Sequence, residues 1–166
     1  MDKIDRTILS LMQRNADFTV DQIGDRVGLS KAPCSRRIQR LRDNGVIRKA
    51  VALLDPAELN VSTTVFVMIK TSKHSADWLE KFSKAMQHLP EVTEIHRMSG
   101  DVDYLIRIVV PDIAGYDAVY KKMIGAVEMS DVSASFVLET IKATTELPLE
   151  YIHADQPGKS AKKSAK

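Results

Sequence analysis

The residues best suited to chemistry gather between positions 30 and 42, where cationic and amide side chains follow a helical pattern. Cys34, Ile38 and Leu41 recur at helical spacing and predict a buried side. The other sides are polar, and an arginine guanidinium there can clamp guanine O6 and N7 or bind a phosphate. The candidate DNA contacts on this predicted helix are Lys31, Ala32, Ser35, Arg36, Arg37, Gln39 and Arg40.

A second short helix is predicted immediately before this one. Thr19 and Gln22 have the spacing of a capping box, and Ile23 and Val27 share one face. Gly28 is expected to end that helix, and Ser30 to cap the next. Two short helices joined by a tight turn are typical of a helix-turn-helix. The alternative is an ordinary helical hairpin with a solvated cationic face.

Residues 1–54 are predicted to form one domain around this pair. A third helix is expected over about positions 3–14, from an apolar stripe of Ile4, Ile8, Leu11 and Met12. After the turn signal Asn44-Gly45, residues 46–54 predict short extended pieces, and hence a wing. Arg48 and Lys49 would then lie near phosphates, or they are ordinary surface charges.

Residues 55–62 predict a linker, and residues 63–150 predict a second domain. Strands are expected at 63–71, 92–98, 103–110 and 132–144, and helices at 75–88 and 112–127. The inward positions of the second of these helices are Tyr116, Val119, Tyr120, Met123 and Ile124. This βαββαβ order is the ferredoxin-like arrangement, with both helices on one face of an antiparallel sheet. The fold class is therefore α+β, with an N-terminal winged helix-turn-helix.

The other face of the sheet also carries apolar residues. Consecutive apolar positions occur at 65–69 and 136–138, which indicates burial on both faces. Because the helices cover only one face, we expect a second copy of the chain to cover the other. The sequence thus predicts a homodimer formed through the sheets.

Charge is distributed unevenly along the chain. The net charge of +2 combines +5 over residues 1–50, −7 over 51–158 and +4 over 159–166. A basic head on an acidic body is typical of a DNA-binding domain fused to another domain. Residues 151–166 are predicted to be a disordered basic tail, which either adds sequence-independent attraction to DNA or has no role.

Composition argues against a membrane-spanning or secreted protein and favours a cytoplasmic location. No apolar run approaches the ~18 residues that span a membrane, and the early Asp2 and Asp5 are unlike a signal peptide. One cysteine permits no internal disulfide, which fits a cytoplasmic, nucleoid-associated protein. Cys34 is interpreted as a small core residue, with a redox sensor as the alternative.

The sequence gives little sign of an enzyme. The four histidines, His74, His88, His96 and His153, lack metal-ligand spacing. No nucleophile motif and no phosphate-binding glycine loop is present. We therefore expect neither catalysis nor a metal or cofactor.

Four separated motifs resemble the leucine-responsive/asparagine regulator (Lrp/AsnC) family of transcription factors. They are DKIDRTILSLMQRNA, GLSKAPCSRRIQRLRDNGVI, the linker start ALLDP, and SGDVDYLIRIVVPD. The resemblance covers roughly residues 1–150. It implies a DNA-reading helix over Ser30–Arg42 and a C-terminal RAM/ACT-like domain that binds a free amino acid between subunits. It also implies dimers joined through their sheets, often assembled into octamers, that regulate amino-acid metabolism or transport.

The resemblance further implies where the effector binds. The effector-site positions of the family match Met98, Gly100, Asp101, Asp103, Tyr104, Ser135, Phe136 and Val137. Residues outside the general pattern, such as Lys70–Ser75 with Trp78, look closest to the cysteine-responsive branch. Leucine or another apolar amino acid is the alternative effector.

The local chemistry at these positions is compatible with an amino acid. Asp101 and Asp103 could bind an ammonium, and backbone N–H groups around Gly100 could bind a carboxylate. The residues alone favour a plain hairpin turn, and the family resemblance is what favours an effector site.

Three functions remain open from the sequence. The leading hypothesis is a sequence-specific transcription regulator modulated by a small amino acid. The second is a nucleoid-architectural protein that wraps DNA without an effector. The third is a small-molecule-binding or catalytic α+β domain with a basic adaptor.

Overall fold

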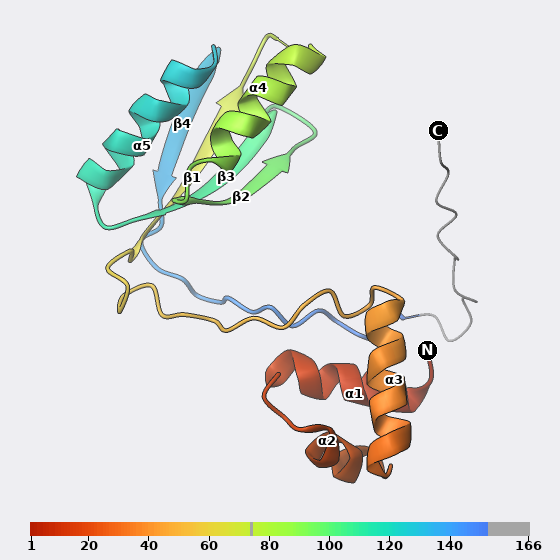
Figure 1. Ribbon diagram of the computed structural model, residues 1–166. Helices are drawn as coiled ribbons and strands as arrows, with labels where there is room; N and C mark the ends of the chain where they lie inside the picture. The colour runs from red at the N-terminus through yellow and green to blue at the C-terminus, as the bar shows by residue number, and fades with distance from the viewer. Residues whose placement is uncertain (74, 153–166) are drawn as a thin grey trace. The chain divides into compact units, whose positions relative to one another are not determined.

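The computed structural model describes residues 1–73 and 75–152, which form two compact units (Figure 1). Among the described residues, the helical unit contains Met1–Ala52 together with residues 142–152, and the sheet unit contains Leu53–Ile141. The basic tail from position 153 lies outside the described residues. No helix among the described residues is both long and apolar enough to cross a membrane.

The helical unit is built from α1 (Lys3–Arg14), α2 (Val20–Val27) and α3 (Lys31–Asp43). Asp2 caps α1 and Thr19 caps α2, each through a reciprocal capping box with the residue three positions on. Ser30 occupies the N-cap position of α3 as expected, but its side chain makes no capping hydrogen bond. The buried apolar core of the three helices consists of Ile8, Leu9, Ile23, Cys34, Ile38 and Leu41.

The turn between α2 and α3 depends on two glycines. Gly28 ends α2 with φ of 70°, a left-handed conformation that side chains rarely adopt. A Cβ on Gly24 would lie only 2.5 Å from the carbonyl oxygen of Leu29. This close approach lets the Leu29 N–H donate to Gly24 O at 2.9 Å. The two glycines therefore set how closely α3 follows α2.

The short extended pieces expected over residues 46–54 form no β-strand in the structure. Within this segment, Val51, Leu53 and Leu54 are exposed. The N–H groups of Val46 and Ile47 both donate to Leu41 O, at 2.9 and 3.1 Å. These two N–H groups cap the C-terminal end of α3, so they cannot also form hydrogen bonds between β-strands.

The C-terminal segment belongs to the helical unit, which corrects the expected domain end at 150 and tail start at 151. The Leu147 N–H donates to Gln13 Oε1 at 2.7 Å, and Gln13 Nε2 donates back to Leu147 O at 3.2 Å. Arg6 Nη2 donates to Ile152 O at 2.8 Å. Leu149 and Ile152 pack against the helical core. Residues 142–152 therefore complete a unit whose other elements lie at the opposite end of the chain.

The sheet unit has the predicted βαββαβ order: β1 (Thr63–Lys70), α4 (Ala76–Gln87), β2 (Val92–Arg97), β3 (Tyr104–Val110), α5 (Ile113–Ala126) and β4 (Asp131–Phe136). The strands lie side by side in the order β2-β3-β1-β4, and all neighbours are antiparallel. The prediction of a long fourth strand over 132–144 was wrong. β4 ends at Phe136. The Val137 N–H still bonds to Thr64 O at 2.9 Å, and β1 extends only one residue beyond that partner, to Thr63.

Both helices cover the same face of the sheet (Figure 1). Alternate residues of β1 and β3 are buried on this face, where they meet Phe82 and Met86 of α4 and Val119 and Met123 of α5. Ile124, expected inward, is 45% exposed. On the other face, Phe66 and Met68 of β1 and Leu105 and Val109 of β3 are only partly buried. That face is an uncovered apolar surface in the described single chain.

Replacing Gly24 by alanine is expected to destabilise the helical unit. The added methyl group would clash with Leu29 O, and such overpacking costs about 1–3 kcal/mol. Alanine's better helix propensity offsets at most ~1 kcal/mol of this. Urea unfolding followed by far-UV circular dichroism measures the loss.

The matched control is Gly125→Ala in α5, where an added Cβ has nothing within 4 Å. It should be neutral or stabilising by up to ~1 kcal/mol. Fluorescence of Trp78, the single tryptophan, follows the sheet unit separately. If Gly24→Ala has the same free energy of unfolding as the wild type, the turn can move the Leu29 carbonyl away from the added methyl group without loss of stability, which would contradict this prediction.

Candidate DNA-binding and effector-binding sites

The solvent face of α3 carries most of the predicted DNA contacts. Ala32, Ser35 and Arg36 are exposed, and Arg36 makes no ion pair with any described residue. Lys31 Nζ lies 2.8 Å from Asp21 Oδ2, and this hydrogen bond raises the pKa of the lysine. Gln39 Nε2 donates to Asp43 Oδ1 at 2.7 Å. Among the arginines predicted to contact DNA, Arg36 is thus the one most open to a new ligand.

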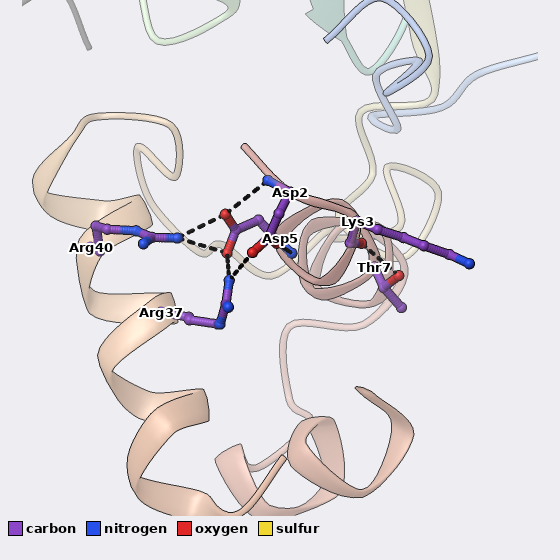
Figure 2. A network of polar contacts seen from close by, with 6 residues as sticks. All are labelled: Asp2, Lys3, Asp5, Thr7, Arg37 and Arg40. Atoms are coloured by element: carbon purple, nitrogen blue, oxygen red, sulfur yellow. Dashed lines mark hydrogen bonds and ion pairs between the residues drawn. The ribbon is translucent and has the colours of Figure 1, made fainter. Parts of the chain in front are cut away.

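Two of the predicted contacts, Arg37 and Arg40, point instead toward the start of α1 (Figure 2). Arg40 Nη2 donates to both oxygens of the Asp5 carboxylate, at 2.9 and 2.7 Å. Arg37 Nη1 lies 2.9 Å from Asp5 Oδ1 and 2.6 Å from Asp2 Oδ2. The side chain of Arg37 is 26% exposed and that of Arg40 is 54% exposed, so only Arg40 keeps a largely open guanidinium.

The Asp5 carboxylate is almost completely buried, with 2% of its side chain exposed. A buried carboxylate is stable only when it is paired and hydrogen-bonded, and two guanidinium groups and the Asp2 N–H meet this need. The Asp5 N–H and the Arg37 guanidinium together hold the pKa of the Asp2 carboxyl below its usual value. The Asp2 and Asp5 carboxylates raise the pKa of Arg37 in return.

Sequence reasoning missed the role of Asp2 and Asp5, which it used only to argue against a signal peptide. Their three-residue spacing before an apolar stripe was the available signal, because it matches a capping box. That pattern predicts the start of α1, but it does not predict that Asp5 pairs with Arg37 and Arg40 of α3.

Cys34 is fully buried on the inner side of α3, and burial raises the pKa of its thiol. A less ionised, inaccessible thiol is poorly reactive, which favours the core interpretation over a redox sensor.

The predicted effector loop connects β2 and β3. Met98 N–H donates to Asp103 O at 2.8 Å and closes the hairpin, and Gly100 has φ of 105°. One Asp103 carboxylate oxygen accepts the Thr71 N–H at 2.8 Å, so this side chain already holds the loop to the end of β1. Asp101 is exposed and has no hydrogen-bond partner among the described residues. Tyr104 is only 6% exposed and packs inward.

The other predicted effector residues lie at the opposite end of the sheet. Phe136 pairs with Val65 at the start of β1, whereas Tyr104 pairs with Ile69 near its end. At about 3.3 Å per residue the two positions are roughly 13 Å apart along β1, on strands that flank it on opposite sides. Phe136 packs edge-on against Tyr116, with ring centroids 5.3 Å apart. One chain therefore does not bring Ser135, Phe136 and Val137 together with the loop.

Among the residues that the structure describes, no cluster of His, Cys, Asp and Glu could hold a metal ion.

Known proteins resemble the chain over nearly all of its length. Residues 1–48 match the family described as winged helix-turn-helix DNA-binding, and residues 64–147 match the Lrp/AsnC ligand binding domain. The chain is 41% identical over 152 residues to the HTH-type transcriptional regulator Zrp of Zymomonas mobilis, which covers 92% of this chain and 99% of that protein.

Two solved structures share the fold and much of the sequence. An AsnC family transcriptional regulator from Agrobacterium tumefaciens has 54% identity and a TM-score of 0.89, and covers 92% of this chain and 100% of its own. The transcriptional regulator NMB0573 from Neisseria meningitidis, solved as an L-Met complex, has 33% identity and a TM-score of 0.86. The match covers 90% of this chain and 97% of that one.

The matched relatives are transcription regulators, not enzymes. A helix-turn-helix with a cationic reading helix is thus joined to a βαββαβ domain of the matching ligand-binding class. The chain belongs to the Lrp/AsnC family of DNA-binding transcription regulators.

Proposed function

We propose that this regulator reads specific DNA sites through α3 and that a small amino acid modulates its binding. In this proposal each dimer inserts two α3 helices into successive major grooves of a pseudo-palindromic site. The observation that carries the proposal is the exposed face of α3 around Arg36, on a unit joined to a ligand-binding domain. Such a regulator acts in the cytoplasm, where the nucleoid lies.

The contacts around α3 support a division of labour among the predicted DNA residues. Ala32, Ser35 and Arg36 are free to meet base edges. Lys31 and Gln39 can exchange their partners for DNA, because exposed ion pairs are weak. Arg37 and Arg40 are held by carboxylates, so we assign them to positioning α3 and, for the more open Arg40, to phosphate contact.

We assign the effector site to two subunits rather than one. The loop residues Met98, Gly100, Asp101 and Asp103 of one copy would meet Ser135, Phe136 and Val137 of another. Tyr104, which was also predicted for this site, packs inward against α4 and is left out of the assignment. The separation of the two sets within one chain supports this assignment. The L-Met complex of the Neisseria relative supports an amino-acid ligand, and cysteine and leucine are the first candidates for this chain. The ligand must bind one assembly state better than another to alter DNA binding.

The subunits would meet through the uncovered sheet face. Phe66, Met68, Leu105 and Val109 form an apolar centre there, which a second copy could bury. We propose a homodimer through this face, with dimers assembling to an octamer as the resemblance implies.

The first test is binding to a fragment of the gene's own upstream region, at fixed salt, with and without each of the twenty amino acids. We expect specific binding, and one amino acid that changes affinity several-fold or alters the pattern of bands. Tight binding that no amino acid changes would favour the architectural alternative.

Arg36→Ala should lose sequence discrimination and keep stability. An arginine fork on guanine is worth about 1–3 kcal/mol of discrimination against the wrong base, and Arg36 has no described partner to lose. Competition against unrelated DNA at physiological salt measures the ratio of specific to non-specific affinity.

The contrasting variant is Asp5→Asn, which should lower stability first. It leaves Arg37 and Arg40 with a weaker, neutral partner, and a loss of about 1–3 kcal/mol is expected after allowing for the exposure of Arg40. Equal stability of both variants, or unchanged specificity of Arg36→Ala, would contradict the division of labour.

Met68→Lys should dissociate the dimer, because a charge on the apolar sheet face opposes burial there. Light scattering coupled to size exclusion at micromolar concentration gives the mass. Ile113→Lys is the control, since Ile113 is 71% exposed on α5 and away from that face. A monomeric wild-type protein would overturn the proposed assembly.

A further inference from the structure

A small hollow lies inside the sheet unit, between the first turn of α4 and the adjoining ends of β2 and β3. Its volume is about 250 Å³, below the ~300–1,000 Å³ of pockets for drug-sized ligands. The hollow therefore suits a molecule the size of an amino acid. Its lining residues are Ser75, Ala76, Trp78, Leu79, Arg97 and Tyr104.

The register of the sheet places Arg97 in this hollow. Arg97 and Tyr104 are direct cross-strand partners, and such partners share a face of the sheet. Tyr104 packs against Trp78 and Phe82 of α4, with ring centroids 5.7 and 4.7 Å apart. Arg97 is therefore on the helix-covered face as well, at the exposed edge strand β2.

The hollow gathers hydrogen-bond donors that have no acceptor in the described chain. Arg97 makes no ion pair with a described residue. Tyr104 is 6% exposed, yet its hydroxyl makes no hydrogen bond with the described residues. The Tyr104 oxygen is not fully buried, so it stays open to donate to a ligand that enters the hollow.

The start of α4 adds two more donors. Ser75 Oγ accepts the N–H of Trp78 at 3.2 Å, and Ser75 O accepts the N–H of Leu79 at 3.1 Å. The N–H groups of Ala76 and Asp77 come first in the helix and have no partner within it. The positive end of the α4 dipole favours an anion here. The lining itself contains no carboxylate.

We propose that this hollow binds a small carboxylate with a short apolar side chain, an amino acid or the corresponding 2-oxo acid. Arg97 and the first N–H groups of α4 would bind the carboxylate, and the Tyr104 hydroxyl would donate to its second oxygen. Trp78 and Leu79 would contact the apolar part. The inference rests on the proposed amino-acid response, and it adds a site contained within one chain.

The position of the hollow links it to the effector loop. Asp103 Oδ2 accepts the N–H of Thr71, at the start of the segment that leads to α4. A ligand held between α4 and Arg97 would therefore contact both segments that this hydrogen bond joins: the β2–β3 hairpin and the segment from Thr71 to α4. Binding in one chain can thus alter the loop that we assign to the subunit interface.

Trp78 provides a direct readout, because it is the single tryptophan of the chain and lines the hollow. The full-length protein is titrated to millimolar L-methionine, L-cysteine and L-leucine while its emission is recorded. Each amino acid is paired with its decarboxylated amine: 3-(methylthio)propylamine, cysteamine and isopentylamine. We also test the matching 2-oxo acids to distinguish the two sources of the carboxylate.

We expect at least one of these carboxylates to change the Trp78 emission, and its amine to leave it unchanged. Arg97→Gln should weaken that response by about tenfold, since it removes a charge-assisted pair. Tyr104→Phe should weaken it less. The matched control is Lys121→Gln, because Lys121 is an exposed cation on α5 that pairs with Asp117 and lies outside the lining of the hollow. Circular dichroism checks that each variant folds.

Two outcomes would overturn this site: no emission change with any carboxylate, or an equal response from wild type and Arg97→Gln. DNA binding separates this failure from failure of the proposed function. An amino acid that still shifts DNA binding without moving Trp78 emission would leave the regulator standing and exclude the hollow. An Arg97-dependent emission change with no effect on DNA binding would support the hollow as a binding site and exclude the proposed amino-acid modulation of DNA binding.

Discussion

The helical unit depends on one buried carboxylate, that of Asp5, held between two arginines of α3. Their guanidinium groups come from positions 37 and 40, one helical turn apart, so a single carboxylate fixes both the rotation of α3 and its distance from α1. The apolar stripe of α3 alone would allow sliding, because hydrophobic contact has no direction. The exposed residues around Arg36 take their orientation from this contact. In the proposed function, contacting DNA and folding the unit are therefore assigned to different arginines of one helix.

In the sheet unit the governing constraint is antiparallel topology. With β1 in the centre, the β2–β3 hairpin loop and the end of β4 must fall at opposite ends of the same strand. The candidate effector residues are thereby divided, and two copies are needed to reunite them. The same topology leaves one sheet face uncovered. The proposed assembly and the proposed ligand response would therefore both follow from the strand order of the sheet.

Local patterns in the sequence predicted much of this architecture. The helix-turn-helix followed from the Thr19 capping box and the apolar spacing of α3, and the βαββαβ order followed from periodicity. Contacts between distant positions could not be predicted in this way. No local pattern near Arg40 identifies Asp5 as its partner. The length of β4 depends on its pairing with the distant strand β1. Residues 147–152 pack on α1 from more than 130 positions away. The sequence predicted the exposed side of α3 and the position of the β2–β3 loop. It did not predict that Arg37 and Arg40 are paired with carboxylates of the same unit.

Because residues 142–152 pack on α1, the sheet unit is an insertion within the helical unit. The ribosome makes the chain from its N-terminus, so the three helices leave it long before the residues that complete their core. Domains of nascent chains generally fold as units while synthesis continues. Here the sheet unit can finish first, and the DNA-binding unit closes last. A chain interrupted before Leu147 would carry a complete ligand-binding fold and an unfinished DNA-binding one, so truncated products would compete poorly for operators.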